Sequence, residues 1–446
     1  MTFVPLDLPE ELFGLIIGYL PFSDRVGLSL VNRPLRERLL PYVFYQTKLA
    51  STAIDQGSMS DEDGHMVLRR HGRYACRVYC DFLQSRLADR DAFLTESLRH
   101  VPHLRRIHLR GLTQPLATYI PRYLPPSRTS HLTHLSLTHH DKYRDASNVS
   151  RSPPPSSSEL YPPDRGLFRI LARCPRLRFL ELVGPRFRLS YPQWTQLFLY
   201  HCPQLIHLRT RACGDDNLIH AIAAALPRLV TLQLSFHEIE GPTLALLPLH
   251  CPNLRSLFMY PLPVRQNHLL ETMDAQHWPR LRYLHLTGDY YERPPTDIAA
   301  IARYLCPFRH PWTNLQTLSL DNVSLGDLVW EQIATRCPQL KDVTFDGCPI
   351  TDVALRRLLE RLPRLERFRL RNIECELTPA CLPKRIASDR LYHLAMIIKD
   401  FQPSWLFHLQ PQLSHLRELV LFKFNKKPNP REVQQYFPGV TISFDS

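Results

Sequence analysis

Residues 338–363 read PQLKDVTFDGCPITDVALRRLLERLP and contain one complete structural repeat. The first eight residues follow the phrase P-x-L-x-x-L-x-L, with Phe345 in the last position. Val343 and Phe345 alternate with more polar residues, which is typical of a short strand that turns every second side chain toward a core. The stretch therefore predicts a strand that ends at a turn formed by Asp346 and Gly347.

A helix is expected to follow this turn and to end at a proline. Asp352 stands where an N-cap is needed, and apolar residues then recur at helical spacing. These residues are Val353, Leu355, Leu358, Leu359 and Leu362. Because Pro363 lacks the amide hydrogen that a helix would use, the helix ends before it. Such a unit buries its apolar face only against neighbouring units, as in a solenoid.

The same phrase recurs along most of the 446-residue chain. The first apolar residue of each copy lies at position 104, 132, 177, 205, 229, 254, 281, 315, 340, 365, 391 or 416. Most steps are 24 to 28 residues, inside the roughly 20–29 residues of a leucine-rich repeat. A weaker copy, from Ala75 to Cys80, would form the N-terminal unit. The sequence therefore predicts an α/β leucine-rich-repeat solenoid over residues 73–446, with parallel strands inside and helices outside.

Two steps are longer, at 45 and 34 residues, and indicate insertions. Residues 138–165 include the stretch SRSPPPSSS, a composition typical of a disordered loop. Residues 287–296 carry the adjacent Tyr290 and Tyr291, which would be able to touch a partner beside a binding face.

Cysteine usage and hydropathy indicate the class of protein. Six of the eleven cysteines directly precede a proline, which indicates a recurrent packing position. Cys76 and Cys80, with His71 nearby, lack a second pair at zinc spacing, so we expect no metal and no other cofactor. The start is acidic, unlike a signal peptide, and the longest apolar run is too short for a bilayer. We therefore expect a reduced, cytoplasmic and/or nuclear setting and no membrane partner.

The net charge of +13 is concentrated in arginine-rich stretches. Residues 66–110 hold ten Arg against four acids, and residues 161–211 hold nine against two. The planar guanidinium suits bidentate contacts with carboxylate or phosphate groups. The alternative is a basic flank that is only solvated.

The residue between the two apolar positions of each strand is expected on the concave side of the solenoid. This column reads His108, Ser136, Glu181, Arg209, Gln233, Phe258, His285, Ser319, Thr344, Arg369, Ala395 and Val420. Aromatic and polar residues in this mixture suit recognition of a protein. The candidate substrate-binding residues are Arg106, His108, Arg110, Arg209, Arg211, Phe258, His285, Tyr290 and Tyr291. The arginines among them would suit an acidic or phosphorylated segment.

Residues 6–46 do not fit the repeat and predict a small module of three helices, followed by a linker over residues 47–72. Three short helices cannot bury all of their apolar surface by themselves. The remaining leucine and isoleucine surface requires either a partner or the solenoid. If this surface packs against the solenoid, the module is a helical cap on the solenoid.

Three phrases of this module resemble the F-box: Leu8-Pro-Glu-Glu-Leu12, Ile16-x-x-Tyr-Leu20 and Val31-Asn-Arg33. The repeats resemble the cysteine-containing leucine-rich repeats that many F-box proteins carry. The family's usual tryptophan near the end of the module is replaced by Pro41-Tyr-Val-Phe-Tyr45. The resemblance implies docking on the Skp-type adaptor of a cullin–RING ubiquitin ligase. The docking residues implied are Leu8, Pro9, Leu12, Ile16, Leu20, Leu28 and Val31.

The motifs of common enzymes are missing from the sequence. It contains no P-loop, no G-x-S-x-G and no H-E-x-x-H. We therefore expect a non-catalytic substrate-recognition subunit of an SCF-type E3 ubiquitin ligase, which bridges the adaptor and a protein substrate. The alternative is a leucine-rich-repeat scaffold outside any ligase. A third reading, nucleic-acid binding, rests on the charge alone, since no basic motif interleaved with aromatic residues supports it.

Overall fold

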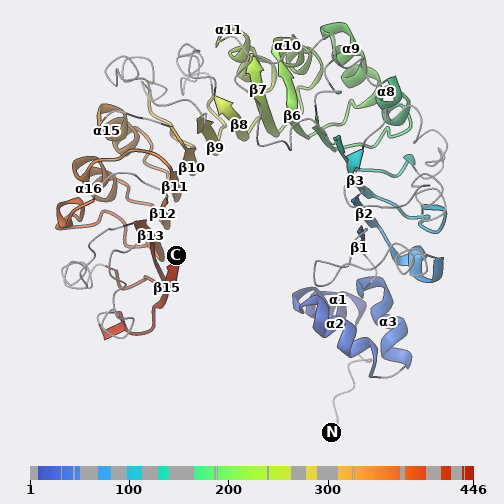
Figure 1. The fold of residues 1–446 in the computed structure, drawn as a ribbon, viewed down its shortest axis with the longest axis horizontal. Helices are drawn as coiled ribbons and strands as arrows, with labels where there is room; N and C mark the ends of the chain where they lie inside the picture. The colour runs from blue at the N-terminus through green and yellow to red at the C-terminus, as the bar shows by residue number, and fades with distance from the viewer. Residues whose placement is uncertain are drawn as a thin grey trace, which may run out of the picture. The chain divides into compact units, whose positions relative to one another are not determined.

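In a computed structural model the chain divides into two compact units, Met1–Cys213 and Gly214–Ser446. The structure describes residues 9–31, 33–43, 46–50, 69–81, 98–112, 129–139, 165–184, 187, 189–238, 241–262, 278–288, 310–323, 325, 327–371, 377–397, 413–422, 434–435 and 437–445. Each unit contains parallel strands with helices in the connections between them (Figure 1). Most of the predicted insertion at residues 138–165 lies outside the described residues.

The first unit begins with three helices, α1 (Glu10–Tyr19), α2 (Phe22–Ser29) and α3 (Arg33–Val43), as the sequence predicts. Their small core consists of Phe13, Ile17, Leu35, Leu39 and Val43. The Tyr42 ring meets the Phe13 ring edge-on, with 5.9 Å between centroids. Only one face of α1 takes part in this core, which leaves its other face available.

The strands of the first unit form a parallel sheet in the order of the sequence. They are β1 (Gln46–Ala50), β2 (Arg77–Asp81), β3 (Arg106–Leu112), β4 (His134–His139), β5 (Phe179–Val183) and β6 (His207–Asp215). The helical connections include η2 (Gly72–Tyr74), α8 (Arg165–Leu171), α9 (Tyr191–Gln196) and η4 (Leu197–His201).

The sheet begins earlier than residue 73, where the sequence predicts its start. Except for its first residue, strand β1 lies within the segment expected as a linker, and it pairs with β2, Gln46 opposite Arg77. The two strands pair through their backbone N–H and C=O groups. An edge strand can therefore form without the regularly spaced leucines of the repeat phrase. The sequence therefore carries little signal for β1.

The second unit continues the same architecture with strands in sequence order and parallel. They are β7 (Thr231–Glu238), β8 (Ser256–Leu262), β9 (Tyr283–Gly288), β10 (Thr317–Asp321), β11 (Asp342–Asp346), β12 (Arg367–Arg371), β13 (His393–Ile397), β14 (Glu418–Phe422) and β15 (Thr441–Asp445). Strand β15 follows the last predicted copy of the phrase. The expected solenoid fold is confirmed.

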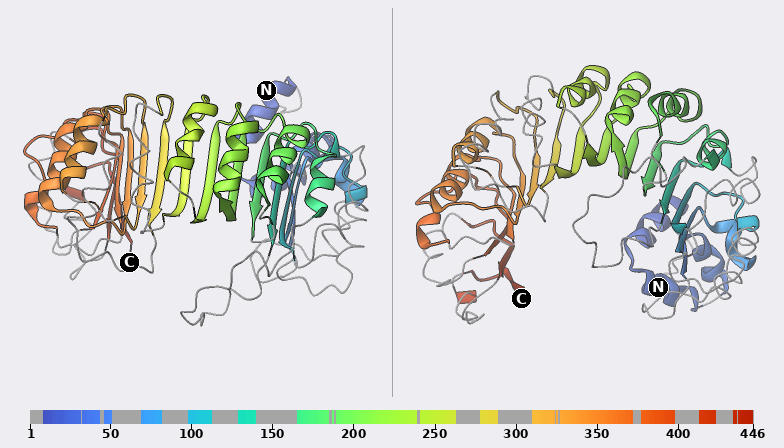
Figure 2. Two further views of the ribbon diagram at one scale, coloured as in Figure 1. Left: turned by 90° about the horizontal axis from the view of Figure 1, so that it is seen from above. Right: turned by 45° about the horizontal axis from the view of Figure 1, so that its top comes forward.

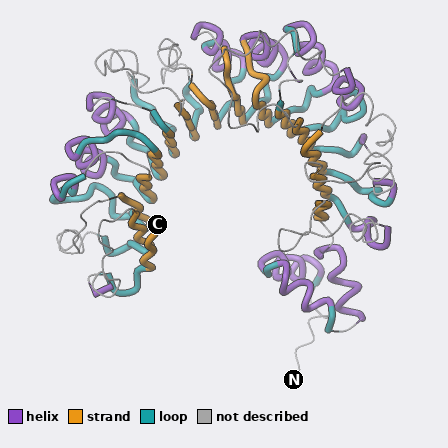
Figure 3. Tube along the Cα trace, in the orientation of Figure 1, coloured by secondary structure: helices purple, strands orange, loops and turns teal. Residues whose placement is uncertain are grey.

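The helices of the second unit lie on one side of its strands (Figures 2 and 3). They are α10 (Asp216–Ala225), α11 (Gly241–Leu244), α12 (Leu246–His250), α15 (Asp327–Arg336), α16 (Asp352–Arg361) and η5 (Pro379–Cys381). The predicted helices at residues 216–225 and 352–361 are thus present. A third predicted helix, at residues 297–305, lies outside the described residues.

The repeat formed by β11 and α16 shows how each unit is built. Val343 and Phe345 are fully buried, while Thr344 between them lies on the opposite face of the sheet. The turn after β11 needs Gly347, because its φ is 62° and a Cβ there would lie 2.1 Å from the Asn322 side chain. A glycine is therefore required at this turn for steric reasons.

The cap of α16 differs from the prediction by one residue. Thr351, not Asp352, is the N-cap, and its hydroxyl accepts the amide hydrogen of Ala354 at 3.2 Å. The Asp352 carboxylate instead accepts the amide hydrogen of Thr378 at 2.9 Å. Asp352 therefore joins two neighbouring repeats, and the expectation that it caps the helix is wrong.

The cysteines that precede prolines pack in the core, as predicted. Cys174, Cys202, Cys251, Cys337 and Cys348 are all buried, and Cys306 lies outside the described residues. Burial raises the pKa of both Cys174 and Cys251 to about 12. These thiols stay protonated at neutral pH and are not reactive nucleophiles.

Two residues of α16 provide a direct test of the assigned core. Leu358→Ala is expected to lower the free energy of unfolding by about 2–5 kcal/mol, because Leu358 is fully buried. Val353→Ala, on the exposed side of the same helix, is expected to change it by less than about 0.5 kcal/mol. Urea denaturation followed by circular dichroism measures both changes. Equal effects of the two substitutions would contradict the assigned packing.

Candidate protein-binding surfaces

Helix α1 exposes a stripe of large apolar side chains. Leu12, Leu15, Ile16 and Tyr19 have between 50% and 88% of their surface accessible. Their spacing of three and four residues places them on one face of the helix, away from Phe13 and Ile17 in the core. Because soluble proteins rarely expose such residues as a group, the stripe is a candidate contact site for another molecule.

The end of α2 adds two more exposed apolar residues, Leu30 and Val31. Leu20 and Leu28, by contrast, are partly buried and pack against the core of the three helices. Their apolar character is therefore already used inside the module.

The structure separates the implied docking residues into three groups. Pro9, Leu12, Ile16 and Val31 are exposed, Leu20 and Leu28 are partly buried, and Leu8 lies outside the described residues. The sequence-based set omits Leu15, Tyr19 and Leu30, which are all exposed. The helical spacing from Leu12 through Leu15 to Tyr19 is the signal that could have found two of them.

The strands carry a second candidate surface, on the sheet face opposite the buried positions. In the first unit, pairing aligns His108, Ser136, Glu181 and Arg209 in one row across neighbouring strands. In the second unit it aligns Gln233, Phe258, His285, Ser319, Thr344, Arg369, Ala395 and Val420. We call these rows the central rows of the strand face. The central rows consist of the residues that lie between the two apolar positions of each strand, which the sequence predicts for the concave side.

The Glu181 carboxylate organises the central row of the first unit. Ser136 Oγ donates to Glu181 Oε2 at 2.6 Å, and Arg209 Nη1 lies 3.1 Å from Glu181 Oε1. His108 Nδ1 lies 3.9 Å from Glu181 Oε2. Arg209 thus has an internal anionic partner, which makes it less suited to a second anion than the sequence suggests.

Arginines flank this row on both sides. Arg106 and Arg110 lie on the same face of β3 as His108, because they alternate with the buried Ile107 and Leu109. Arg110 pairs in register with Thr138, Thr138 with Val183, and Val183 with Arg211. Arg110 and Arg211 therefore occupy equivalent positions near the ends of their strands. Arg110 and Arg211 are exposed, whereas Arg106 is half-buried.

Aromatic rings occupy the row beside the arginines. The His134 ring stacks on Phe179 with 5.5 Å between centroids and 21° between planes. Burial and the nearby guanidinium groups of Arg106 and Arg77 lower the pKa of His134 to about 4. Burial also lowers the pKa of His207, the next residue of this row. At neutral pH the imidazole of His134 is therefore an uncharged aromatic surface.

The second unit has an aromatic patch on β8 and β9. The ring centroids of Phe258 and Tyr260 lie 6.0 and 4.8 Å from that of His285, and Tyr283 is exposed on the same strand as His285. His285 Nε2 lies 3.1 Å from Asp321 Oδ2. Tyr290 and Tyr291 lie outside the described residues. Aromatic side chains of this kind are common anchors in protein interfaces.

Charged residues on β11 to β14 form an internal ladder. Asp342 Oδ2 lies 2.7 Å from Arg367 Nη2, and Arg369 Nε donates to His393 Nε2 at 3.3 Å. The other ring nitrogen of His393 lies 2.7 Å from Glu418 Oε2. Because each group has a partner of opposite charge or matching polarity, this region holds the strands together rather than presenting open charge.

Metal ligands do not gather in the part of the chain that the structure describes: it contains no group of three or more His, Cys, Asp or Glu side chains able to hold an ion. None of the described helices has the length and apolar character needed to cross a bilayer.

Comparison with known proteins adds one family match. Residues 5–40 match the F-box domain family. A chain in the crystal structure of the yeast Rad7 and Elc1 complex is similar in structure, with a TM-score of 0.43 and 15% sequence identity over 94% of this chain and 92% of that chain. No curated protein sequence matches.

The chain therefore carries an F-box domain at residues 5–40, and parallel strands and helices in the arrangement of a leucine-rich-repeat solenoid follow it. The assignment rests on the match at residues 5–40 and on the observed repeat architecture. Membership of the cysteine-containing subtype stays a prediction from the sequence.

The pKa of His134 can be checked by titration. We expect its imidazole to stay neutral down to about pH 4, as followed by NMR. The unfolded chain binds this proton near pH 6.5, so this residue lowers the stability of the folded state as the pH falls from 6.5 to about 4. Arg106→Gln should raise the pKa, because it removes a nearby positive charge. Arg110→Gln, on the same strand, should leave it unchanged; equal shifts would refute the assigned cause.

Proposed function

We propose that this chain is the substrate-recognition subunit of an SCF-type ubiquitin ligase. The F-box domain would bind a Skp-type adaptor and, through it, a cullin–RING ligase. The strand face of the repeats would bind a protein substrate. The chain itself would be a non-catalytic adaptor subunit, acting by bringing the substrate close to the ligase.

The exposed stripe on α1 is the observation that carries this proposal. An F-box domain with Leu12, Leu15, Ile16 and Tyr19 exposed has an apolar surface that its own core does not use. Covering such side chains contributes about 1.5–3 kcal/mol for each large residue, which is enough to drive association. The alternative, a helical cap on the solenoid, would require these residues to be covered within the chain.

The strand face supports the second half of the proposal. In the second unit it carries the aromatic side chains of Phe258 and Tyr283, and in the first unit the exposed arginines Arg110 and Arg211. Interfaces are enriched in aromatic residues and arginine at their energetically important positions. A scaffold outside any ligase would use the same strand face, so binding to the adaptor separates the two functions.

Docking is tested by co-purification with a recombinant Skp-type adaptor. The intact chain should bind, and Leu12→Asp with Ile16→Asp should weaken binding at least about 100-fold, because two interface residues of this kind contribute about 2 kcal/mol each or more. Both residues are about half exposed, so the double variant should keep its circular dichroism spectrum.

A matched control places the same charges elsewhere. Leu199→Asp with Leu249→Asp changes two exposed leucines outside the F-box and should leave adaptor binding intact. Undiminished binding by the Leu12 and Ile16 variant would show that this stripe is not the docking surface. Absence of binding by the intact chain would favour the scaffold alternative.

Substrate binding is tested in cells with the docking-deficient chain, which should hold substrates without promoting their ubiquitination. Proteins that it captures, and whose half-life shortens when the intact chain is expressed, are the readout. Phe258→Ala with Tyr283→Ala should reduce their capture by about tenfold or more, since aromatic anchors contribute about 2 kcal/mol.

The corresponding control removes aromatic and apolar groups from the helix side. Leu199→Ala with Tyr200→Ala changes two exposed residues of η4 and should leave capture unchanged. If that pair reduces capture while the strand-face pair does not, the assignment of the binding face is wrong.

A further inference from the structure

Strands β8 to β11 differ in charge from the chain as a whole. Although the chain carries a net charge of +13, these four strands contain no Lys and no Arg. Their charged residues are three aspartates, Asp321, Asp342 and Asp346. Arginines return on the next strand, β12. The strand face of β8 to β11 is therefore an acidic region within a basic protein.

Two of the three aspartates lie beside arginines of β12. Asp342 Oδ2 lies 2.7 Å from Arg367 Nη2, and Asp346 stands in register with Arg371. Asp321 lies one strand further from β12, in register with Asp346. Its negative charge is therefore less compensated by neighbouring arginines than that of the other two.

Two polar side chains hold the Asp321 carboxylate in place. Oδ2 lies 3.1 Å from His285 Nε2, and Oδ1 accepts a hydrogen bond from Ser319 Oγ at 3.5 Å. The Asp321 side chain is nevertheless 28% exposed, so another molecule can reach it. A carboxylate that is oriented and still accessible suits the binding of a cation.

An aromatic surface adjoins this carboxylate. The rings of Tyr260 and Phe258 lie close to the His285 ring, at 37° and 35° to its plane, and all three side chains are partly exposed. Because His285 also contacts Asp321, the rings and the carboxylate form one continuous surface, which we call the aromatic–Asp321 site. The face of an aromatic ring carries partial negative charge, so both parts of this site attract a cation.

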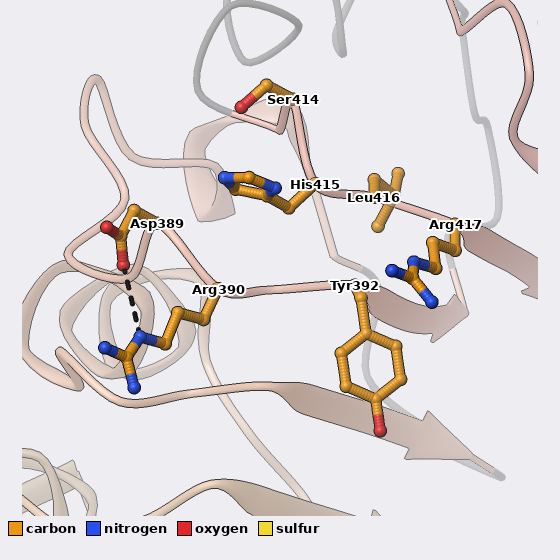
Figure 4. Close-up of a pocket in the computed structure, with 7 residues that line it drawn as sticks. All are labelled: Asp389, Arg390, Tyr392, Ser414, His415, Leu416 and Arg417. Atoms are coloured by element: carbon orange, nitrogen blue, oxygen red, sulfur yellow. Dashed lines mark ion pairs between the residues drawn. The ribbon is translucent and has the colours of Figure 1, made fainter.

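The pocket near the end of the chain lacks such a concentration of one charge. It has a volume of about 730 Å³ and lies between the segments that precede β13 and β14. Figure 4 shows its two arginines, Arg390 and Arg417, toward opposite ends of the opening. Asp389 Oδ1 lies 3.9 Å from Arg390 Nε. Charges of both signs are thus spread around this pocket, and they select no ligand of a single charge.

The chemistry of the aromatic–Asp321 site favours arginine among the basic side chains. A guanidinium group is planar, so it can stack on an aromatic ring while it donates hydrogen bonds to a carboxylate. It is also more weakly hydrated than the ammonium group of lysine. Because the rings and the carboxylate are only partly exposed, a cation must leave some of its water to bind, which costs arginine less than lysine.

We propose that the aromatic–Asp321 site binds an arginine side chain of a protein segment lying on the strand face of the second unit. The inference rests on the proposed function of the strand face in binding a protein, and it assigns a place and a chemistry to part of that face. The guanidinium group would stack on Tyr260 and Phe258 and donate to Asp321.

The experiment applies the full chain to an array of short random peptides, each made with arginine, lysine or citrulline at its centre. Citrulline has nearly the shape of arginine without its charge. The arginine versions should bind about tenfold more strongly than the citrulline versions, since ring and carboxylate act together, and more strongly than the lysine versions. Non-specific attraction would give the opposite order, because the chain carries a net charge of +13.

Variants of the site separate charge from structure. Asp321→Asn keeps the shape of the side chain and should abolish the arginine preference, whereas Asp321→Glu keeps the charge and should retain most of it. Tyr260→Leu should lower the preference by about threefold, as expected for the loss of one cation–π contact. Glu360→Gln removes one negative charge from an exposed position of α16 and should have no effect.

Three results would overturn the proposal. They are the absence of an arginine preference in the intact chain, whether all versions bind equally or none binds, equal or stronger binding of the lysine versions, and an unchanged preference in Asp321→Asn. Adaptor binding is measured on the same preparations. Adaptor binding without an arginine preference would refute this site alone, and an arginine preference without adaptor binding would refute the proposed ligase function alone.

Discussion

In most of the described repeats one carbonyl oxygen accepts two amide hydrogens from the next repeat, and the strand face depends on these hydrogen bonds. The Gln316 carbonyl accepts from Lys341 and Asp342, and the Lys341 carbonyl accepts from Glu366 and Arg367. The same pattern occurs at the carbonyls of Cys76, Arg105, Thr133 and Arg178 in the first unit, and at those of Val230, Arg255, Arg282, Glu366 and Tyr392 in the second. Since most of the described strands begin at such a pair of hydrogen bonds, residues at equivalent positions align across the strands of each unit and form rows.

This alignment divides the chemistry of each unit between two faces. Buried leucines, phenylalanines and proline-flanked cysteines hold neighbouring repeats together, while the other face is left to polar, aromatic and charged residues. Glu181 and the ladder from Asp342 to Glu418 neutralise much of that charge internally. The overall charge of +13 is therefore a poor guide to function, and the local pattern of exposed arginines and aromatic rings is more informative.

The repeat period and the alternation within each strand predicted the solenoid and the rows of the strand face, because both follow from backbone geometry. Contacts between side chains of different repeats were not predictable. Nothing in the sequence shows that Glu181 pairs with Arg209, that Asp352 bonds to the next repeat, or that Leu28 packs inward while Leu15 stays exposed. Such details depend on which neighbour each side chain meets once the repeats are stacked.

The central claim is that docking and recognition use separate surfaces, the first on α1 and the end of α2 and the second on the strand face. Hydrogen–deuterium exchange of the full chain, with and without a Skp-type adaptor, tests this claim most directly. The account predicts that the adaptor slows exchange of residues 10–31 and leaves the strands from β3 onward unchanged. Slower exchange across the strands, with no change in residues 10–31, would contradict it.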